Sequence, residues 1–578
     1  MQRRWRTRDH YLPRGDYKTR RGLRIDMKNR KRQKISVSGL SAGGSVESCL
    51  EELEALSGVA GAESKASEVP KSSKKRKTLF KDDHDVDDVT RIDTSDDILW
   101  DPSLKSGASA LCATNPKVIL REKVSEWNKA MRIWSAKKGK GVYTRGLLPS
   151  LEVEVARHFQ VEQLSSFLLK ACDTDSVKMP VFERWLIDAR VEKEICFPGW
   201  KGHDVYDPVI GAACCSSSSR SSRRLLEELT DAGIKLEEAK KTIIALCRKA
   251  TDAVSELSAL GKRYADKIAL HKGDRIVLEQ HDQIYSLLFH CKSWKKPYCI
   301  RVAKTHYMKL KDMFLSVHNR STDSAARLRF TDGGKPTKVL HAFHYLIMVM
   351  LVRYSSLSGG QLLLELRGGG MQGAVHGAVF RTLQAFFPND PLLECFASPM
   401  NCYLPLFGSA FDIDWHFGSL GDFLTLDIIS GCCEVNPPFA PGLMDKMVDH
   451  IVRCIEQADQ RRACLSFVVI VPTVPDKDEM EAKTAAAKRH AAPSFRRMTQ
   501  SPYCRKHFVL SAREHGYISG SQHLRLSRYK YSIFDTSVIL LQSEMARKVD
   551  LDVEEFESRL RKSFASKHIK ELNQRKGK

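Results

Sequence analysis

The pattern that most limits the fold begins at about residue 330, where short apolar runs alternate with amphipathic helical stretches. Strands that alternate with helices are typical of βαβ units, which build a mostly parallel sheet. The sequence therefore predicts an α/β fold for this region, and in such sheets ligands bind beyond the carboxyl ends of the strands. The runs that we expect to form strands are 391–396, 423–426, 465–471, 508–510 and 538–541.

The preceding region, residues 106–325, has a helical pattern instead. Apolar residues recur mainly three or four positions apart from Leu151 to Leu168, and again from Leu236 to Leu260. A Ser/Arg-rich linker at 214–224 separates these two stretches. The second is too short for a long partner-binding coiled coil, so we favour a helix packed on its own chain.

Residues 1–105 are expected to be a disordered N-terminal region, because they combine basic and acidic blocks with few aromatic residues. Residues 1–34 hold 14 Lys and Arg against 3 Asp, and the whole chain carries +23. This charge favours a polyanionic partner, nucleic acid before membrane. Basic clusters at 30–34 and 74–77 indicate nuclear localisation.

Membrane-spanning and zinc-ribbon proteins are disfavoured by the sequence. The longest apolar run, 345–352, is far shorter than the ~20 residues of a spanning helix. The chain has 16 Cys but no C-x-x-C pair, so we expect no metal site.

One tetrapeptide, Asn436-Pro437-Pro438-Phe439, follows a short apolar run and precedes an amphipathic stretch. Two consecutive prolines make a stiff loop, because their φ is fixed and they have no N–H. The Asn436 side-chain oxygen and the Pro437 carbonyl can accept the two hydrogens of an exocyclic amine, while Phe439 stacks on its base. On these four residues alone, an ordinary proline-rich turn remains an equal alternative.

A second element points to a nucleoside-sulfonium cofactor. An expected strand carries an acidic residue near its end and continues into a loop of small residues, which permits close approach of a ligand. No glycine-rich G-x-G signature is present there, so the loop is weak evidence by itself. The candidate cofactor contacts are Glu394, Ala397, Ser398, Pro399 and Asn401, followed by the small-residue turn of Phe417, Gly418 and Ser419.

Over about residues 300–545 the sequence resembles the cap-specific adenosine N6-methyltransferases, the phosphorylated-CTD-interacting factor family. The resemblance implies a Rossmann-like class I methyltransferase domain that uses S-adenosylmethionine and packs against an N-terminal helical domain. It implies methyl transfer to N6 of the adenosine next to the 7-methylguanosine cap of RNA, with Asn436 to Phe439 catalytic. The matching runs are 307–311, 394–403, 409–411, 417–419, 434–439, 443–445 and 519–523.

These patterns divide the chain into four predicted parts: 1–105, the helical domain 106–325, the methyltransferase domain 326–548, and a C-terminal helix with a basic tail, 549–578. The phosphates of a capped RNA need Arg and Lys, although a solvated basic surface explains each such residue about equally well. The candidate substrate contacts are Arg301, Lys304, Arg497, Arg505 and Lys506, and by resemblance the loop of Ser519, Gly520, Ser521, Gln522 and His523.

The sequence also departs from the family. Ala440-Pro441-Gly442 stands where the family carries acidic residues, and Trp5 and Trp100 lack the spacing of the WW module found in animal members. Binding to phosphorylated polymerase tails is therefore not supported by the sequence, while the transcription machinery stays open as a partner of another kind. Two other functions stay open: nitrogen methylation of uncapped RNA, DNA or protein by the same fold, and an inactive nuclear scaffold that only binds RNA.

Overall fold

The structure of the protein is a computed structural model. The predictions for residues 1–98, with both basic clusters, for Ser521 and Gln522, and for the basic tail after residue 565 lie outside the described residues. The described residues are 99–104, 112, 120–127, 129, 149–172, 179–192, 206–212, 219–265, 275–291, 294–319, 329–332, 335–360, 370–475, 486–520, 523–524 and 529–565.

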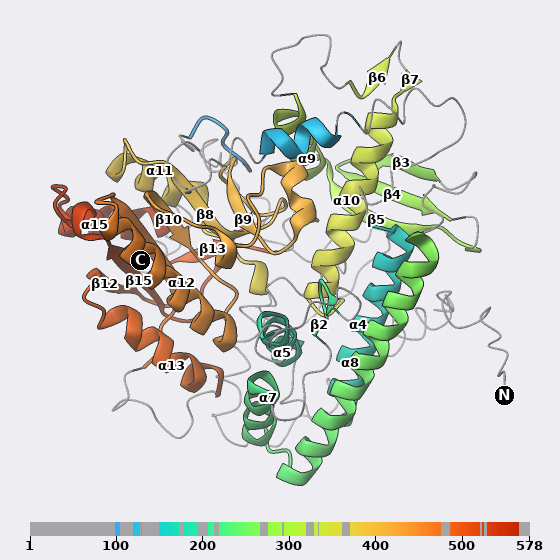
Figure 1. Cartoon of the computed structure of the whole chain (residues 1–578), viewed down its shortest axis with the longest axis horizontal. Coiled ribbons are helices and arrows are strands. Elements are labelled where there is room, and N and C mark those ends of the chain that lie inside the picture. Colours follow the sequence, from blue (N-terminus) through green and yellow to red (C-terminus); the bar gives the residue numbers. More distant parts are fainter. Residues whose placement is uncertain are drawn as a thin grey trace, which may run out of the picture.

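A six-stranded sheet forms the centre of the C-terminal half (Figure 1). Its strands are β8 (Leu392–Ala397), β9 (Phe407–Ser409), β10 (Gly431–Val435), β11 (Leu465–Pro472), β12 (Cys504–Leu510) and β15 (Thr536–Gln542). Their order is β12-β15-β11-β10-β8-β9. β15 runs antiparallel to β11 and β12, and the other described strands of the sheet all run in one direction. The carboxyl ends of these five strands therefore lie along one edge.

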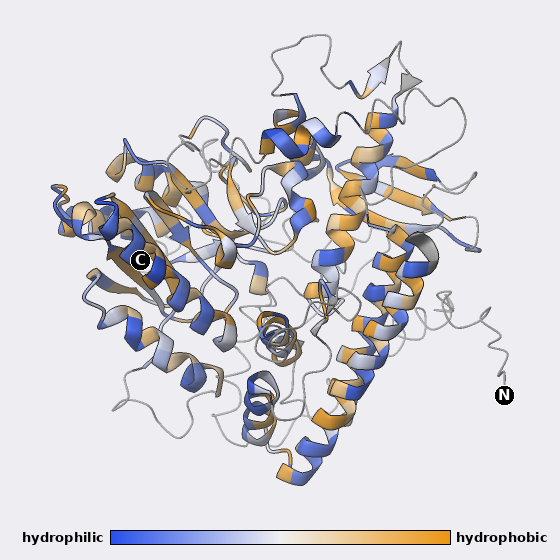
Figure 2. Cartoon of the chain, viewed as in Figure 1, coloured by the Kyte–Doolittle hydropathy of each residue, from blue (hydrophilic) through white to orange (hydrophobic). Residues whose placement is uncertain are grey.

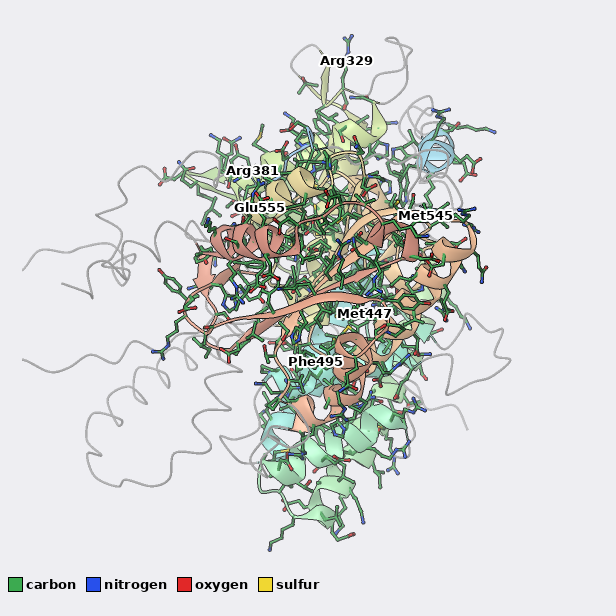
Figure 3. All side chains as sticks on the ribbon, turned by 90° about the vertical axis from the view of Figure 1, so that its left-hand side faces the viewer. Arg329, Arg381, Met447, Phe495, Met545 and Glu555 are labelled. Atoms are coloured by element: carbon green, nitrogen blue, oxygen red, sulfur yellow. The ribbon has the colours of Figure 1, made fainter. Side chains whose placement is uncertain are left out.

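Helices cover both faces of this sheet. Met447 and Phe495, from the pair of helices on one face, belong to an apolar cluster with Leu393, Cys433 and Val469. In Figure 3 the labelled Met447 and Phe495 lie on one side of the strands, and Arg381 and Glu555 lie on the other. The helices are α12 (Pro441–Gln460) and α13 (Ala486–Thr499) on the first face, and α11 (Gly377–Phe386) and α15 (Val553–Phe564) on the second.

The α/β prediction is confirmed at the level of a mixed fold with a mostly parallel central sheet, which is compatible with a Rossmann-like methyltransferase. Four of the five expected strands are present, as β8, β11, β12 and β15. The strand expected at 423–426 is wrong. Phe423–Thr425 is a 3-10 helix, because the Asp422 side chain accepts a hydrogen bond from Leu424 N and closes a tight turn.

Long helices fill the N-terminal half, as the spacing of apolar residues predicts. α4 starts after Ser150, whose side chain caps the helix by accepting from Val153 N. α4 packs against both α8 and α10. The blue residues along α8 in Figure 2 mark the hydrophilic face of α8. The main helices here are α4 (Leu151–Ala171), α5 (Met179–Val191), α7 (Arg220–Asp231), α8 (Leu236–Ala265), α9 (Lys304–His318) and α10 (Lys338–Leu357).

Two features of the N-terminal half differ from the sequence prediction. The expected linker at 214–224 becomes helical from Arg220, because the Ser219 side chain caps α7 by accepting from Ser222 N. The region also contains strands, including an antiparallel three-stranded sheet in the order β3-β4-β5. The additional elements are β1 (Tyr206–Asp207), β2 (Gly211–Ala212), β3 (Arg275–His281), β4 (Ile284–His290), β5 (Tyr298–Ala303), β6 (Thr331–Asp332) and β7 (Lys335–Pro336).

α10 is long and apolar enough to cross a membrane by length and composition. In the structure, however, 83% of its most apolar 18-residue stretch is buried inside the protein, as in a core helix. It follows the predicted domain boundary at 325/326 but packs on α4, which precedes that boundary. The remaining short elements are 3-10 helices Gly370–Gln372 and Asp412–Phe417, strands β13 (Gly516–Ile518) and β14 (Tyr529–Tyr531), and α14 (Glu544–Arg547).

Candidate active site at the carboxyl edge of the sheet

The loops that follow β8 and β10 lie side by side, because these strands are parallel neighbours. The loop after β8 contains Ser398, Pro399 and Asn401, and the loop after β10 is Asn436 to Phe439. The structure therefore brings the predicted cofactor loop and the predicted catalytic loop to one place. This edge is where open α/β sheets bind ligands.

The Asn436 side chain has a defined orientation. Its Nδ2 donates to the carbonyl of Gly373 at 3.0 Å, so the amide oxygen Oδ1 faces the other way. Asn436 and Pro438 are half-buried and Pro437 is buried. The ring of Phe439 is 5% exposed and belongs to the apolar cluster between the sheet and α12. The stacking of Phe439 on a base stays a prediction.

A segment remote in sequence lies across both loops. Asn401 Nδ2 donates to the carbonyl of Gln372 at 2.9 Å, next to the Gly373 carbonyl that binds Asn436. The Asn401 oxygen in turn accepts from the backbone N–H and the hydroxyl of Ser398. Ala374 continues the segment and pairs with Ile518 of β13. Two asparagines, one from each loop, thus hold consecutive carbonyls of the same segment.

The first predicted cofactor residue, Glu394, is 2% exposed on β8. Its Oε2 accepts from the backbone N–H groups of Tyr403 (2.7 Å) and Leu404 (3.2 Å). Lys309 of α9 holds the backbone just before Tyr403 by donating to the carbonyls of Met400 and Cys402. Burial raises the pKa of the Glu394 carboxyl to about 7, although these N–H groups and the Lys309 charge act in the opposite direction.

A second buried carboxyl group, which the sequence pattern did not single out, lies beside Glu394. Glu434 on β10 is the register partner of Glu394 and is 3% exposed. Its Oε1 has no hydrogen-bond partner among the described residues. Burial, and then the nearby Glu394 charge, raise the pKa of Glu434 well above its ordinary value. The signal in the sequence was an acidic residue inside an otherwise apolar strand.

The second set of predicted cofactor residues flanks β9. Ser419 Oγ lies 2.6 Å from the hydroxyl of Ser409, the last residue of β9. Gly418 has φ 103°, and a Cβ there would lie 2.6 Å from the Pro405 carbonyl, so glycine is required at this turn. Phe417 is buried in the core. This set lies beside the cofactor loop on the β9 side.

Two predicted phosphate contacts lie on β5 and α9, next to the 519–523 loop. Arg301 is exposed near the end of β5, and Lys304 is exposed at the start of α9. Between them, Ala303 N donates to the carbonyl of His523 at 2.5 Å. Ser519 follows Ile518, which pairs with the segment above the Asn436 loop. The described members of the 519–523 loop, Ser519, Gly520 and His523, therefore connect β5 and α9 to the site.

The other three basic candidates lie elsewhere. β12 runs parallel to β10, so Arg505 and Lys506 at its start lie at the opposite edge of the sheet from Asn436. Lys506 pairs with Glu554 and Glu557 of α15 at 2.7 and 2.9 Å. Arg505 donates to the carbonyls of Arg547, Val549 and Leu551. Arg497 on α13 pairs with Asp449 at 2.8 Å. The structure does not bring these three residues to the predicted catalytic loop.

The helical half supports the start of α12, directly after the predicted catalytic loop. Asp188 of α5 accepts from the backbone N–H groups of Gly442 (2.8 Å) and Leu443 (3.3 Å), at the start of α12. Arg224 of α7 bridges Asp188 and Asp445. A Cβ at Gly442 would lie 2.6 Å from Arg224 Nη1 and 2.7 Å from Asp188 Oδ1. Gly442, which belongs to the run that departs from the family pattern, therefore lies at the contact between α5 and α12.

Comparison with known proteins identifies the segment that contains both loops. Residues 327–520 match the family described as "Phosphorylated CTD interacting factor 1 WW domain". The resemblance is confirmed over this segment. A mouse mRNA (2'-O-methyladenosine-N(6)-)-methyltransferase is 38% identical over 200 residues, which are 34% of this chain and 25% of the mouse protein. A human protein of the same name is 37% identical over 201 residues, 34% of this chain and 26% of the human protein.

The match covers only part of these relatives, because the chain aligns with about a quarter of their length. The family segment begins before α10 and ends at Gly520, so it contains β8 to β12 and both strand-end loops. The supporting residues Asp188 and Arg224 lie outside it.

Proposed function

We propose that this protein transfers a methyl group from S-adenosylmethionine to N6 of the adenosine adjacent to the 7-methylguanosine cap of RNA. The relatives named as mRNA (2'-O-methyladenosine-N(6)-)-methyltransferases support the substrate. The observation that carries the proposal is the orientation of Asn436, whose Nδ2 is held by the Gly373 carbonyl. This bond leaves Oδ1 as an acceptor at the carboxyl edge.

The residues at this edge fit a cationic methyl donor. Glu394 and Glu434 are buried carboxyl groups beside the loop, and the Oε1 of Glu434 has no partner among the described residues. Such a group is suited to a positively charged ligand. Ser398 and Ala397 have small side chains, which permit close approach. S-adenosylmethionine, when bound, would supply the sulfonium methyl group; its thioether is the leaving group, and the amine loses one hydrogen as a proton to solvent.

The chain's contribution to the reaction is position and polarity. The exocyclic amine of adenine is a weak nucleophile, because its lone pair is delocalised into the ring. Asn436 Oδ1 and the Pro437 carbonyl are two acceptors on a stiff loop, suited to the two amine hydrogens. Acceptors that are fixed before reaction need no reorganisation as positive charge develops on the nitrogen. Asn436, Pro437, Pro438 and Phe439 are the residues to which we assign catalysis.

The Asn436→Ala variant tests this assignment. We expect methyl transfer to fall by at least about 100-fold, the usual effect of removing one preorganised polar group. Folding should change little, because Asn436 is half-buried and makes one described hydrogen bond. The measurement is methyl incorporation into capped RNA, with thermal melting as the control for folding. Full activity in a folded Asn436→Ala variant would contradict the mechanism.

The proposal includes the route of the RNA and the location of the enzyme. We place the RNA phosphates near Arg301 and Lys304, on the side of the 519–523 loop. The basic N-terminal region supports additional, non-specific RNA affinity and a nuclear location. Capped and uncapped RNAs of one sequence distinguish the alternatives: equal methylation of both removes the cap requirement, and methylation of neither supports a scaffold.

A further inference from the structure

The Glu394 and Glu434 side chains form a pair of carboxyl groups just below the catalytic loop. Register partners in neighbouring parallel strands direct their side chains to the same face of the sheet. Asn436 comes two residues after Glu434, so it continues along that face toward the carboxyl edge. The pair therefore lies between the core of the sheet and the place where a ligand meets the loop.

The two carboxyl groups have unequal surroundings. Glu394 accepts two backbone N–H groups and faces Lys309, which favour its charged form. Glu434 faces the like charge of Glu394, and β11 contributes apolar Val468 beside it. The other titratable groups near Glu434 are Cys433 on its own strand and Tyr517 on β13. None of the described groups facing Glu434 supplies a positive charge.

In the unliganded protein, a bound proton is the simplest way to remove the repulsion between the Glu394 and Glu434 carboxylates. Burial and mutual repulsion disfavour charge on both carboxylates at once, which favours a proton shared by the pair. Glu434 is its natural holder, because burial and the Glu394 charge raise its pKa well above the usual range. A cation that enters the site would replace the proton as the balancing charge.

We propose that the Glu394–Glu434 pair receives the positive charge of the methyl donor, and that Glu434 releases its proton when the donor binds. This inference deepens the proposed function and rests on it. A sulfonium donor carries one more positive charge than the thioether left after methyl transfer. The pair therefore binds S-adenosylmethionine more strongly than the thioether product, S-adenosylhomocysteine. This difference favours release of the product and binding of a new donor.

The proposal predicts the direction in which the affinity for the methyl donor changes with pH. Because binding releases a proton, the affinity for S-adenosylmethionine rises with pH while Glu434 is protonated in the free protein. With one proton released per donor, the association constant changes by up to about tenfold per pH unit. The thioether product, S-adenosylhomocysteine, should show a shallower dependence. The ratio of the two affinities therefore shifts toward the donor as pH rises through neutrality.

Titration calorimetry of the full chain with S-adenosylmethionine tests this directly. Measurements at one pH in buffers of different ionisation enthalpy give the number of protons released per donor bound. We expect close to one proton for the wild type and clearly fewer for S-adenosylhomocysteine. In Glu434→Gln we expect the release to be lost and the affinity ratio to become nearly independent of pH. No proton release in the wild type would overturn the proposal, as would unchanged release in Glu434→Gln.

Two matched variants serve as controls. Asp390 is a half-buried carboxyl group with a burial-raised pKa, located just before β8 at the opposite edge of the sheet, so Asp390→Asn should keep the proton release. Asn436→Ala should also keep it while losing methyl transfer. Loss of release in Asp390→Asn would overturn the assignment to Glu434. Proton release without methylation of any RNA would contradict the proposed function but not the assignment of the released proton to Glu434. Methylation of capped RNA without donor-linked proton release would contradict this inference and leave the proposed function standing.

Discussion

Single residues show how far the sequence could lead. Asn436 is predictable from its immediate neighbours, because two prolines after an expected strand define a rigid loop. Its partner Gly373 is not, because the two residues are 63 positions apart and only the fold brings them together. Likewise, the Arg and Lys content indicates an anionic partner but cannot separate Arg301 from Lys506. That distinction depends on the fold, which puts Arg301 on β5 next to the 519–523 loop and Lys506 at the edge of the central sheet opposite Asn436.

The separation of the basic residues leads to a prediction for RNA binding. Arg301→Ala with Lys304→Ala should weaken binding of capped RNA and reduce the slope of log affinity against log salt by about 0.7 for each phosphate that is no longer neutralised. Lys506→Ala is the matched control, because Lys506 is paired with Glu554 and Glu557 at the other edge. Salt titrations of RNA binding measure both. An equal loss of affinity in the control would contradict the placement of the RNA at the carboxyl edge.

At the scale of elements, the periodic segments were predictable and their ends were not. The strand expected at 423–426 is a 3-10 turn because a single side chain, that of Asp422, caps it. The expected linker contains the start of α7 because Ser219 caps that helix. Caps are local and depend on backbone geometry that an apolar pattern does not contain. The start of α12 differs from these two, because its N–H groups are bound by a residue of another helix, Asp188 of α5.

The cap on α12 leads to a stability prediction. Asp188→Ala leaves two backbone N–H groups of α12 without their acceptor and removes a carboxylate from Arg224. We expect the free energy of unfolding to fall by about 1–3 kcal/mol. Urea unfolding measures this change. Asp231→Ala is a suitable control, because its pair with Arg489 is partly exposed and should contribute less than about 1 kcal/mol. A decrease no larger than in the control would contradict the supporting role of α5.

At the scale of the whole molecule, the helical half and the sheet share a core. One apolar cluster extends from Trp127 through α4, α8 and α10 to Phe417 and Leu443. In Figure 1, α5 and α7 lie between α12 on one side and α4 with α8 on the other. The sequence predicted the two regions from their different periodicity. It could not predict that α10 joins the earlier helices, because a buried helix has no polar face to indicate its partner.

The shared core predicts the behaviour of a shortened chain. A fragment that begins at residue 326 keeps the sheet but loses α4, which packs on α10. The apolar surface of α10 would then be exposed, and such surfaces promote aggregation. We expect the fragment to be poorly soluble and to lack a cooperative melting transition, unlike the full chain. A soluble fragment with a sharp transition would show that the sheet half folds alone.

The central claim is that the loop from Asn436 to Phe439 directs a methyl group to N6 of the adenosine beside the cap. Mass analysis of nucleosides from capped RNA, after incubation with isotopically labelled S-adenosylmethionine, tests it most directly. We predict labelled N6-methyladenosine at the first transcribed position and little label in the same RNA without its cap. Label confined to internal adenosines or to another atom, or no label with folded protein, would contradict the account.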